Sequence, residues 1–191
     1  WGFRLSMHIT MRNLGKPEDY RYQAMRRHWG PRFWIVSLAT VFGLQAVLAW
    51  LVSLPLQAAI SAPQPAHITF FDALGLLVWT AGFLFESIGD WQLARFKSQP
   101  HNRGKLMDRG LWRYTRHPNY FGDALQWWGL WLFAVAVGAW WTAIGPALMT
   151  FLLLRVSGVT MLEKRMMRTR PQYEDYSRRT SAFFPMPPRK A

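Results

Sequence analysis

The chain lacks cysteine, and its acids are few. Without cysteine there are no disulfides, thiolate metal sites or cysteine nucleophiles. Lys and Arg are missing from two long stretches, 33–94 and 118–154, although the net charge is +13. A nucleic-acid-binding protein would spread its bases over one continuous face, so the gaps argue against that class. No GxGxxG and no alternating strand pattern occurs, which excludes a Rossmann domain.

What the chain has in abundance is apolar sequence, with 51% hydrophobic residues and 12 tryptophans in 191. The apolar residues form runs long enough to cross a bilayer, at 33–56, 70–93, 120–138 and 141–162. Thr69 and Asp72 are suited to cap the second run. The short gap before the last run predicts an antiparallel hairpin. Residues 1–10 resemble the end of an earlier helix, and prolines mark a connection at 55–69.

These runs predict an all-α polytopic membrane bundle with four complete transmembrane helices. The chain is interpreted as a single membrane domain, 1–191, that is incomplete at its N-terminus. Each basic block lies on one side of this arrangement and each connection without bases on the other. The positive-inside rule therefore predicts that 11–32, 95–118 and 164–191 are cytoplasmic. The basic C-terminal tail is also expected to attract anionic membrane lipids.

Two carboxylates, Glu86 and Asp90, lie four residues apart on one face of the second span. Ionisable groups inside a membrane are costly and usually face a partner or a water-filled cavity. One interpretation is a structural pair with Arg95 or Arg155, and the other is a functional site. Arg155 is itself predicted to contact Glu86, Asp90 or a ligand anion.

The stretch "RYTRHPNYFGD", 113–123, concentrates polar side chains at the start of the third span. Pro118 is suited to the first helical position, and Asn119 could serve as an N-cap. Capping needs only one or two residues, and seven of the polar residues in this stretch could contribute to a site. We therefore expect a site that includes Arg113, Tyr114, Arg116, His117, Asn119, Tyr120 and Asp123.

A dinucleotide would suit this mixture of side chains. It presents phosphates to Arg and Lys, ribose hydroxyls to Asp, Glu and Asn, and flat rings to Tyr and Trp. Arg155 and Glu163 in the fourth span extend the same set of residue types. Such a cofactor would lie within the helix bundle and open to the cytoplasm.

Two segments, "RGLWRYTRHPNYFGDALQWWG" and "SGVTMLEKRMMRTRPQYEDYSRRTSAFFP", resemble the bacterial membrane proteins of the DUF1295 family, relatives of steroid 5-alpha-reductase. "RHPNYFGD" is also similar to a signature of the sterol C14-reductases. The resemblance implies a bacterial inner-membrane reductase that transfers hydride from NADPH to an activated carbon–carbon double bond of a lipophilic, steroid-like substrate.

The resemblance also implies roles for individual residues. Asn119, Asp123 and Asp90 match cofactor-binding positions, and Lys97 and Lys105 align with bases that contact phosphate. His117 and Tyr120 match the signature without a defined role. The catalytic acids available in this chain are Tyr114, Tyr120 and Glu86. Together with the residues chosen by chemistry, the expected cofactor-binding set is Asp90, Lys97, Lys105, Arg113, Arg116, His117, Asn119, Asp123, Arg155 and Glu163, and no metal is expected.

Two other functions remain open at this point. The isoprenylcysteine and phospholipid methyltransferases share an Arg-His-Pro signature and bind S-adenosylmethionine, a sulfonium cation whose amino group or ribose would be bound by the carboxylates Glu163 and Asp123. A non-enzymatic lipid-binding membrane protein would use the polar cluster only for helix packing. The substrate and the oligomeric state are not determined by the sequence.

Overall fold

A computed structural model describes residues 1–63, 65–156 and 158–189. All their regular elements are helical, and an isolated parallel bridge between Thr115 and Ser181 is the one β-type pairing in this part of the chain. The all-α prediction is therefore confirmed for the described residues. They fall into two compact units, Trp1–Trp50 and Leu51–Ala191, and each is described by itself. The interpretation of 1–191 as one membrane domain stays a prediction.

The first unit begins with two helices that are rich in polar residues. Asp19 caps the second of them, because its carboxylate accepts from the backbone N–H of Arg21 at 2.9 Å. The chain then continues as an apolar helix. One segment of it is π-helical, so that each backbone hydrogen bond there spans one residue more than in an α-helix. The elements are α1 (Gly2–Asn13), α2 (Tyr20–Trp29), η1 (Gly30–Arg32), α3 (Phe33–Ser37), η2 (Leu38–Gly43) and α4 (Leu44–Val52), which ends in the second unit.

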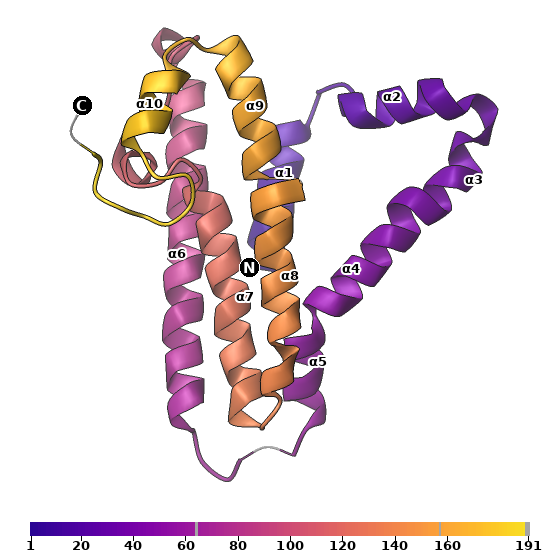
Figure 1. Cartoon of the computed structure of the whole chain (residues 1–191), viewed down its shortest axis with the longest axis vertical. Coiled ribbons are helices and arrows are strands. Elements are labelled where there is room, and N and C mark those ends of the chain that lie inside the picture. The colour runs from indigo at the N-terminus through magenta and orange to yellow at the C-terminus, as the bar shows by residue number, and fades with distance from the viewer. Residues whose placement is uncertain (64, 157, 190–191) are drawn as a thin grey trace. The chain divides into compact units, whose positions relative to one another are not determined.

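The second unit contains the longest helix and the C-terminal elements. Figure 1 shows α6, α7 and α8 side by side, with α10 and the C-terminal tail folded back near one end of α6. The elements are α5 (Leu54–Ser61), α6 (Phe70–Ser98), η3 (Pro100–Asn102), η4 (Gly110–Arg113), α7 (Pro118–Ala136), η5 (Trp140–Ala143), α8 (Ile144–Phe151), η6 (Leu152–Val156), α9 (Val159–Thr169) and α10 (Tyr173–Arg179).

Three helical stretches of the described residues are long and apolar enough to cross a membrane: Tyr20–Val52, Phe70–Ser98 and Trp140–Thr169. The predicted run at 120–138 forms α7, a helix of 19 residues that is not among these three. The predicted count of four transmembrane helices is therefore not confirmed, and three candidate spans are found. The predicted connection at 55–69 is partly wrong, because α5 occupies 54–61 and Pro55 lies in its first turn, where proline is tolerated.

The start of α6 is fixed by the predicted cap. The Thr69 hydroxyl accepts from the backbone N–H of Asp72 at 3.2 Å, and the Asp72 carboxylate accepts from the backbone N–H of Thr69 at 2.8 Å. This reciprocal pair satisfies two backbone donors at the end of a long apolar helix. It fixes the residue at which α6 begins.

Helices α6 and α7 pack through glycines spaced seven residues apart. A Cβ added at Gly82 would lie 2.7 Å from the carbonyl oxygen of Gly122, and one added at Gly75 would lie 3.0 Å from that of Gly129. At the far end, Gly89 approaches Pro118, the first residue of α7. The two backbones are thus close along their antiparallel contact, as small residues permit in membrane helices. This contact carries the end of α6 to the start of α7.

The predicted hairpin of the last two apolar runs is formed by α7 and α8. The indole N–H of Trp128 donates to the hydroxyl of Thr150 at 3.1 Å, and that of Trp131 donates to the carbonyl of Trp140 at 2.9 Å. Phe183 from the C-terminal tail packs in a buried cluster with Ala124 of α7. The tail is therefore held against α7.

Candidate functional site

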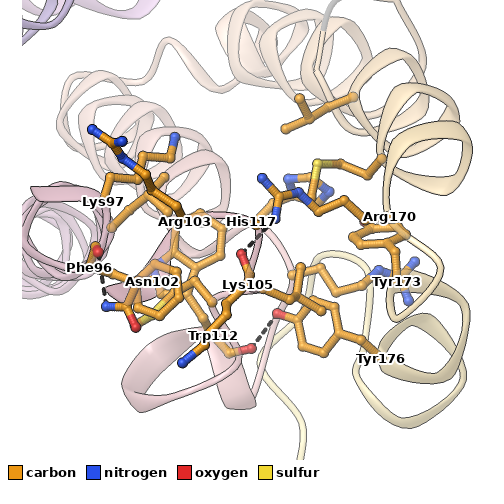
Figure 2. Close-up of a pocket in the computed structure, with 17 residues that line it drawn as sticks. Phe96, Lys97, Asn102, Arg103, Lys105, Trp112, His117, Arg170, Tyr173 and Tyr176 are labelled. Atoms are coloured by element: carbon orange, nitrogen blue, oxygen red, sulfur yellow. Dashed lines mark hydrogen bonds between the residues drawn. The ribbon is translucent and has the colours of Figure 1, made fainter. Parts of the chain in front are cut away.

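A cavity of about 450 Å³ opens in the second unit at the end of α6. Its walls come from four places in the chain: the last turns of α6, the loop at 102–107, the segment before α7, and the region from α9 to α10. Figure 2 shows side chains from these elements around the cavity. The lining residues are Leu93, Phe96, Lys97, Asn102, Arg103, Gly104, Lys105, Leu106, Met107, Trp112, Arg116, His117, Leu162, Met166, Arg170, Tyr173 and Tyr176.

One wall is the loop at 102–107, which follows α6 directly. The Asn102 amide donates to the carbonyl of Phe96 at 3.0 Å and so folds the loop back onto the helix end. Gly104 has a φ of +80°, a conformation that side chains other than glycine seldom adopt. Across the cavity, a guanidinium N–H of Arg170 donates to the carbonyl of Lys105 at 2.8 Å. The loop is therefore joined to the opposite wall.

The opposite wall is aromatic. Trp112 is buried, and its indole N–H donates to the carbonyl of Gly89 on α6 at 3.1 Å. The Tyr176 hydroxyl in turn donates to the carbonyl of Trp112. Tyr173 packs edge-to-face on Tyr176, with ring centroids 5.8 Å apart. These contacts attach α10 to the segment that precedes α7.

A polar cluster joins the two walls at the start of α7. Glu163 on α9 accepts from Arg116 Nε at 2.7 Å, and the same carboxylate oxygen lies 3.3 Å from Nε2 of His117. Arg116 also donates through Nη1 to the carbonyls of Ser177 and Thr180, at 2.6 and 2.7 Å. The guanidinium is thus shared between α9 and the end of α10.

The C-terminal tail completes this arrangement. The backbone N–H of Arg116 donates to the carbonyl of Ser181 at 2.9 Å, and the Thr115 hydroxyl donates to that of Phe183 at 2.8 Å. Farther on, the backbone N–H of Met186 donates to the carbonyl of Tyr114 at 2.9 Å. The segment before α7 therefore has its polar backbone satisfied by the tail, without regular secondary structure.

The two tyrosines of α10 are held in their neutral form. Burial raises the pKa of Tyr173, and the negative charge of Glu163 raises it further. Burial also raises the pKa of Tyr176, with Tyr173 as the next cause. Both side chains are 3% exposed. They can act as hydrogen-bonding or stacking groups in the cavity wall.

Five of the residues predicted for the site meet at this cavity. Lys97, Lys105, Arg116 and His117 line it, and Glu163 binds the last two. They come from α6, the loop, the start of α7 and α9. Their proximity shows that the two segments that carry the family resemblance meet in space.

The acidic pair on α6 lies elsewhere and is divided between two partners. Glu86 is 3% exposed and accepts from the amide of Gln126 on α7 at 2.5 Å. Asp90 accepts from the amide of Asn119 at 3.3 Å. Both carboxylates thus bridge α6 and α7, and neither they nor Asn119 line the cavity. Within the described residues, Arg155 is exposed and forms no ion pair with either acid, so the predicted contact is not found.

The remaining predicted residues in the segment 113–123 do not line the cavity. Tyr120 stacks on the ring of His117, with centroids 5.4 Å apart and planes 7° apart. Arg113 and Tyr114 are exposed, and Asp123 is half-buried one turn into α7. Asn119 is not the N-cap, because His117 occupies that position and Pro118 is the first helical residue, as predicted.

Several lining residues were not included in the predicted site. Trp112 and Arg103 lie beside predicted residues in the sequence, and their residue types suit nucleotide binding. Arg170, Tyr173 and Tyr176 lie within the C-terminal segment that carries the resemblance. A signal was therefore present, but only the folded tail shows that these side chains face one cavity.

Among the described residues, no group of three or more His, Cys, Asp or Glu side chains could hold a metal ion. The chain matches a family described as "Protein of unknown function (DUF1295)" over residues 1–180. No curated protein and no solved structure matches it. The match covers nearly the whole chain, which therefore belongs to the DUF1295 family, as the resemblance predicted.

Proposed function

We propose that this DUF1295 protein is an integral membrane reductase that uses NADPH to reduce an activated carbon–carbon double bond in a lipophilic substrate. One observation carries the proposal: every charged side chain that lines the cavity is a base. These bases are Lys97, Arg103, Lys105, Arg116 and Arg170, and among the described residues no Asp or Glu lines the cavity.

The lining residues fit a phosphorylated nucleotide. Lysine and arginine bind phosphate oxygens by charge-assisted hydrogen bonds, and aromatic side chains stack on nucleotide rings. Figure 2 shows Lys97 and Arg103 on one side of the cavity, and Arg170 beside the two tyrosines on the other. Bases on both sides and aromatic rings on one suit a ligand that carries several phosphates and a flat ring. The volume, about 450 Å³, lies within the range of small-molecule sites.

The same observation argues against the methyltransferase. S-adenosylmethionine carries a sulfonium and an ammonium, which a wall of bases repels and which carboxylates would favour. The carboxylate of Glu163, which contacts two lining residues, is already paired with Arg116 at 2.7 Å. The cavity charge therefore favours an anionic cofactor.

NADPH, when bound, supplies a hydride to an electron-poor alkene carbon. The protein supplies the binding and the surroundings. Its bases would hold the phosphates, and the Arg116–Glu163 pair would keep the α9 wall in place. Apolar lining residues such as Phe96, Leu162 and Met166 exclude water, which strengthens the polar contacts inside. They also suit a lipophilic substrate that enters from the bilayer.

The proposed site also agrees with the predicted topology of the basic blocks. The bases of the cavity lie in the blocks at 95–118 and 164–191, which the positive-inside rule assigns to the cytoplasm. A cofactor site opening there would draw on cytoplasmic NADPH.

The test is ligand-dependent thermal stability of the purified protein in detergent. We expect NADPH to raise the unfolding temperature, because a ligand that binds only the folded state stabilises it by about 2.7 kcal/mol at 100 times its Kd. NADH should have a smaller effect, and S-adenosylmethionine none. Stabilisation by S-adenosylmethionine alone would instead establish the methyltransferase, and no effect of any of the three would favour the non-enzymatic reading.

A matched pair of variants sharpens this test. Arg103→Ala removes an exposed base that lines the cavity, whereas Arg95→Ala removes an exposed base on α6 that does not. Both change the net charge equally. We expect NADPH stabilisation to fall only in Arg103→Ala, and an equal loss in both variants would show that the effect is general electrostatic attraction.

A further inference from the structure

The reduction of a double bond consumes a proton as well as a hydride, and the cavity has one suited source. We propose that His117 is the catalytic proton donor of this site and that Glu163 is the residue that positions it. This inference rests on the proposed function and names a residue role within the same cavity.

His117 is held firmly in the cavity wall. Its side chain is 3% exposed, and its ring stacks on Tyr120 from the next turn of α7. Nε2 lies 3.3 Å from the Glu163 oxygen that also accepts from Arg116 Nε. A carboxylate paired in this way can only accept, so Nε2 carries a hydrogen. The contact therefore fixes the orientation of the imidazole, as carboxylates do for catalytic histidines.

No other lining group is suited to give up a proton near neutral pH. The lysine and arginine side chains stay protonated, and the pKa values of Tyr173 and Tyr176 are raised by burial. The lining contains no Asp, Glu or Cys. Imidazole is the side chain that changes charge between about pH 5 and 8. His117 is thus the one lining residue whose chemistry fits the task.

The acids predicted from the sequence are less suited. Tyr114 is 44% exposed and does not line the cavity. Glu86 is bound to Gln126 between α6 and α7. Tyr120 stacks on the ring of His117 but does not itself line the cavity.

The reduced cofactor would give up a hydride from its own C–H bond and become oxidised, and this hydride would form a C–H bond with one alkene carbon while the π electrons move toward the neighbouring carbon. Because Nε2–H is held by Glu163, the Nδ1–H bond of the His117 imidazolium then breaks, and its proton forms the second C–H bond. The neutral imidazole regains a proton from the solvent. The substrate gains two electrons and two hydrogens in total.

His117 lies beside Glu163 and Arg116, and further bases line the same cavity. Phosphate groups entering the cavity would bring negative charge near the imidazole, and a nearby anion favours the charged form of a base. We therefore expect the protein to take up protons when a polyanion binds. The other charged and titratable groups that face the cavity are Lys97, Arg103, Lys105, Arg170, Tyr173 and Tyr176.

Calorimetry tests this coupling without any turnover. NADPH, or inorganic pyrophosphate as a simple polyanion, is titrated into the full chain in detergent near pH 6.5–7, in two buffers with different ionisation enthalpies. The difference in heat gives the protons taken up, at most about one for a single imidazole. We expect uptake in the parent protein and in His101→Gln, which removes an exposed histidine outside the lining. In His117→Gln, NADPH should still bind, but the uptake should vanish.

Glu163→Gln tests the positioning role. It removes the partner of the imidazolium, so the pH range of proton uptake should move to lower pH. A purely structural role would lower thermal stability and leave that pH range unchanged, which would overturn the role of Glu163. If NADPH binds but uptake is equal in the parent and His117→Gln, the role of His117 is overturned while the proposed function stands. If NADPH does not bind the parent protein, the proposed function itself fails.

Discussion

Arg116 and Glu163 form an ion pair at 2.7 Å between residues 47 positions apart, and it joins the start of α7 to α9. Their side chains are 10% and 16% exposed. Arg116 also donates to two carbonyls at the end of α10, which Lys in its place would not reproduce with the same geometry. This pair and the two carbonyl contacts link the start of α7, α9 and the end of α10 around the cavity.

Arg116→Ala should therefore loosen the C-terminal tail. Removing one partner of a largely buried pair leaves the other charge uncompensated, and we expect a loss of about 3 kcal/mol in unfolding free energy. Unfolding in detergent measures the loss, and limited proteolysis should show earlier cleavage after α9. The control is Arg178→Ala, which breaks an exposed pair with Glu174 and should cost less than about 1 kcal/mol. Equal losses in the two variants would contradict the proposed difference.

The glycine contact between α6 and α7 predicts a steric effect. In Gly82→Ala, the new Cβ would lie 2.7 Å from both the backbone nitrogen of Gln126 and the carbonyl oxygen of Gly122. Backbone atoms cannot move aside as a flexible side chain would, so we expect a loss of about 1–3 kcal/mol from overpacking. Gly2→Ala, which meets open space, is the control and should be neutral or slightly stabilising. A stable Gly82→Ala protein would show that the helices are farther apart.

The tyrosines of α10 predict a loss of stability at high pH. The pKa values of Tyr173 and Tyr176 are raised in the folded protein, so the unfolded chain releases these protons at lower pH than the folded one. Their contribution is complete below about pH 10, the usual tyrosine pKa, and is lost as pH rises above it. Tyrosinate absorbance should show a late phase to which Tyr173 and Tyr176 contribute. Tyr173→Phe should remove one late tyrosine, whereas the exposed Tyr114→Phe should not. Titration of all six tyrosines in one step would contradict this.

Apolar runs and local signals were enough to predict the long apolar helices. The runs at 70–93 and 141–162 lie within the membrane-length stretches Phe70–Ser98 and Trp140–Thr169, and Thr69 and Asp72 predicted the cap of α6. Three candidate spans are found where four were predicted. Helix α7 is not among them, because its tryptophans and polar residues reduce its apolar character. The glycines at 75, 82 and 89 carried a packing signal with a spacing of seven that helical periodicity could have revealed.

Contacts between distant residues could not be predicted in the same way. The spacing of Glu86 and Asp90 placed both on one face of α6, but that face meets α7 at two levels, so each acid has a different partner: Gln126 and Asn119. Sequence spacing fixes the face of a helix and leaves open which residue of another helix lies opposite.

The sequence by itself determined an all-helical chain of membrane character and the two segments that identify its family, because helical period, apolar length and local motifs are properties of neighbouring residues. Only the tertiary structure decided which polar residues meet. The tail returns over the start of α7 through Arg116, Thr115 and Phe183 and thereby brings α9 and α10 to the end of α6. The cavity exists because of that return, which depends on contacts between residues more than forty positions apart.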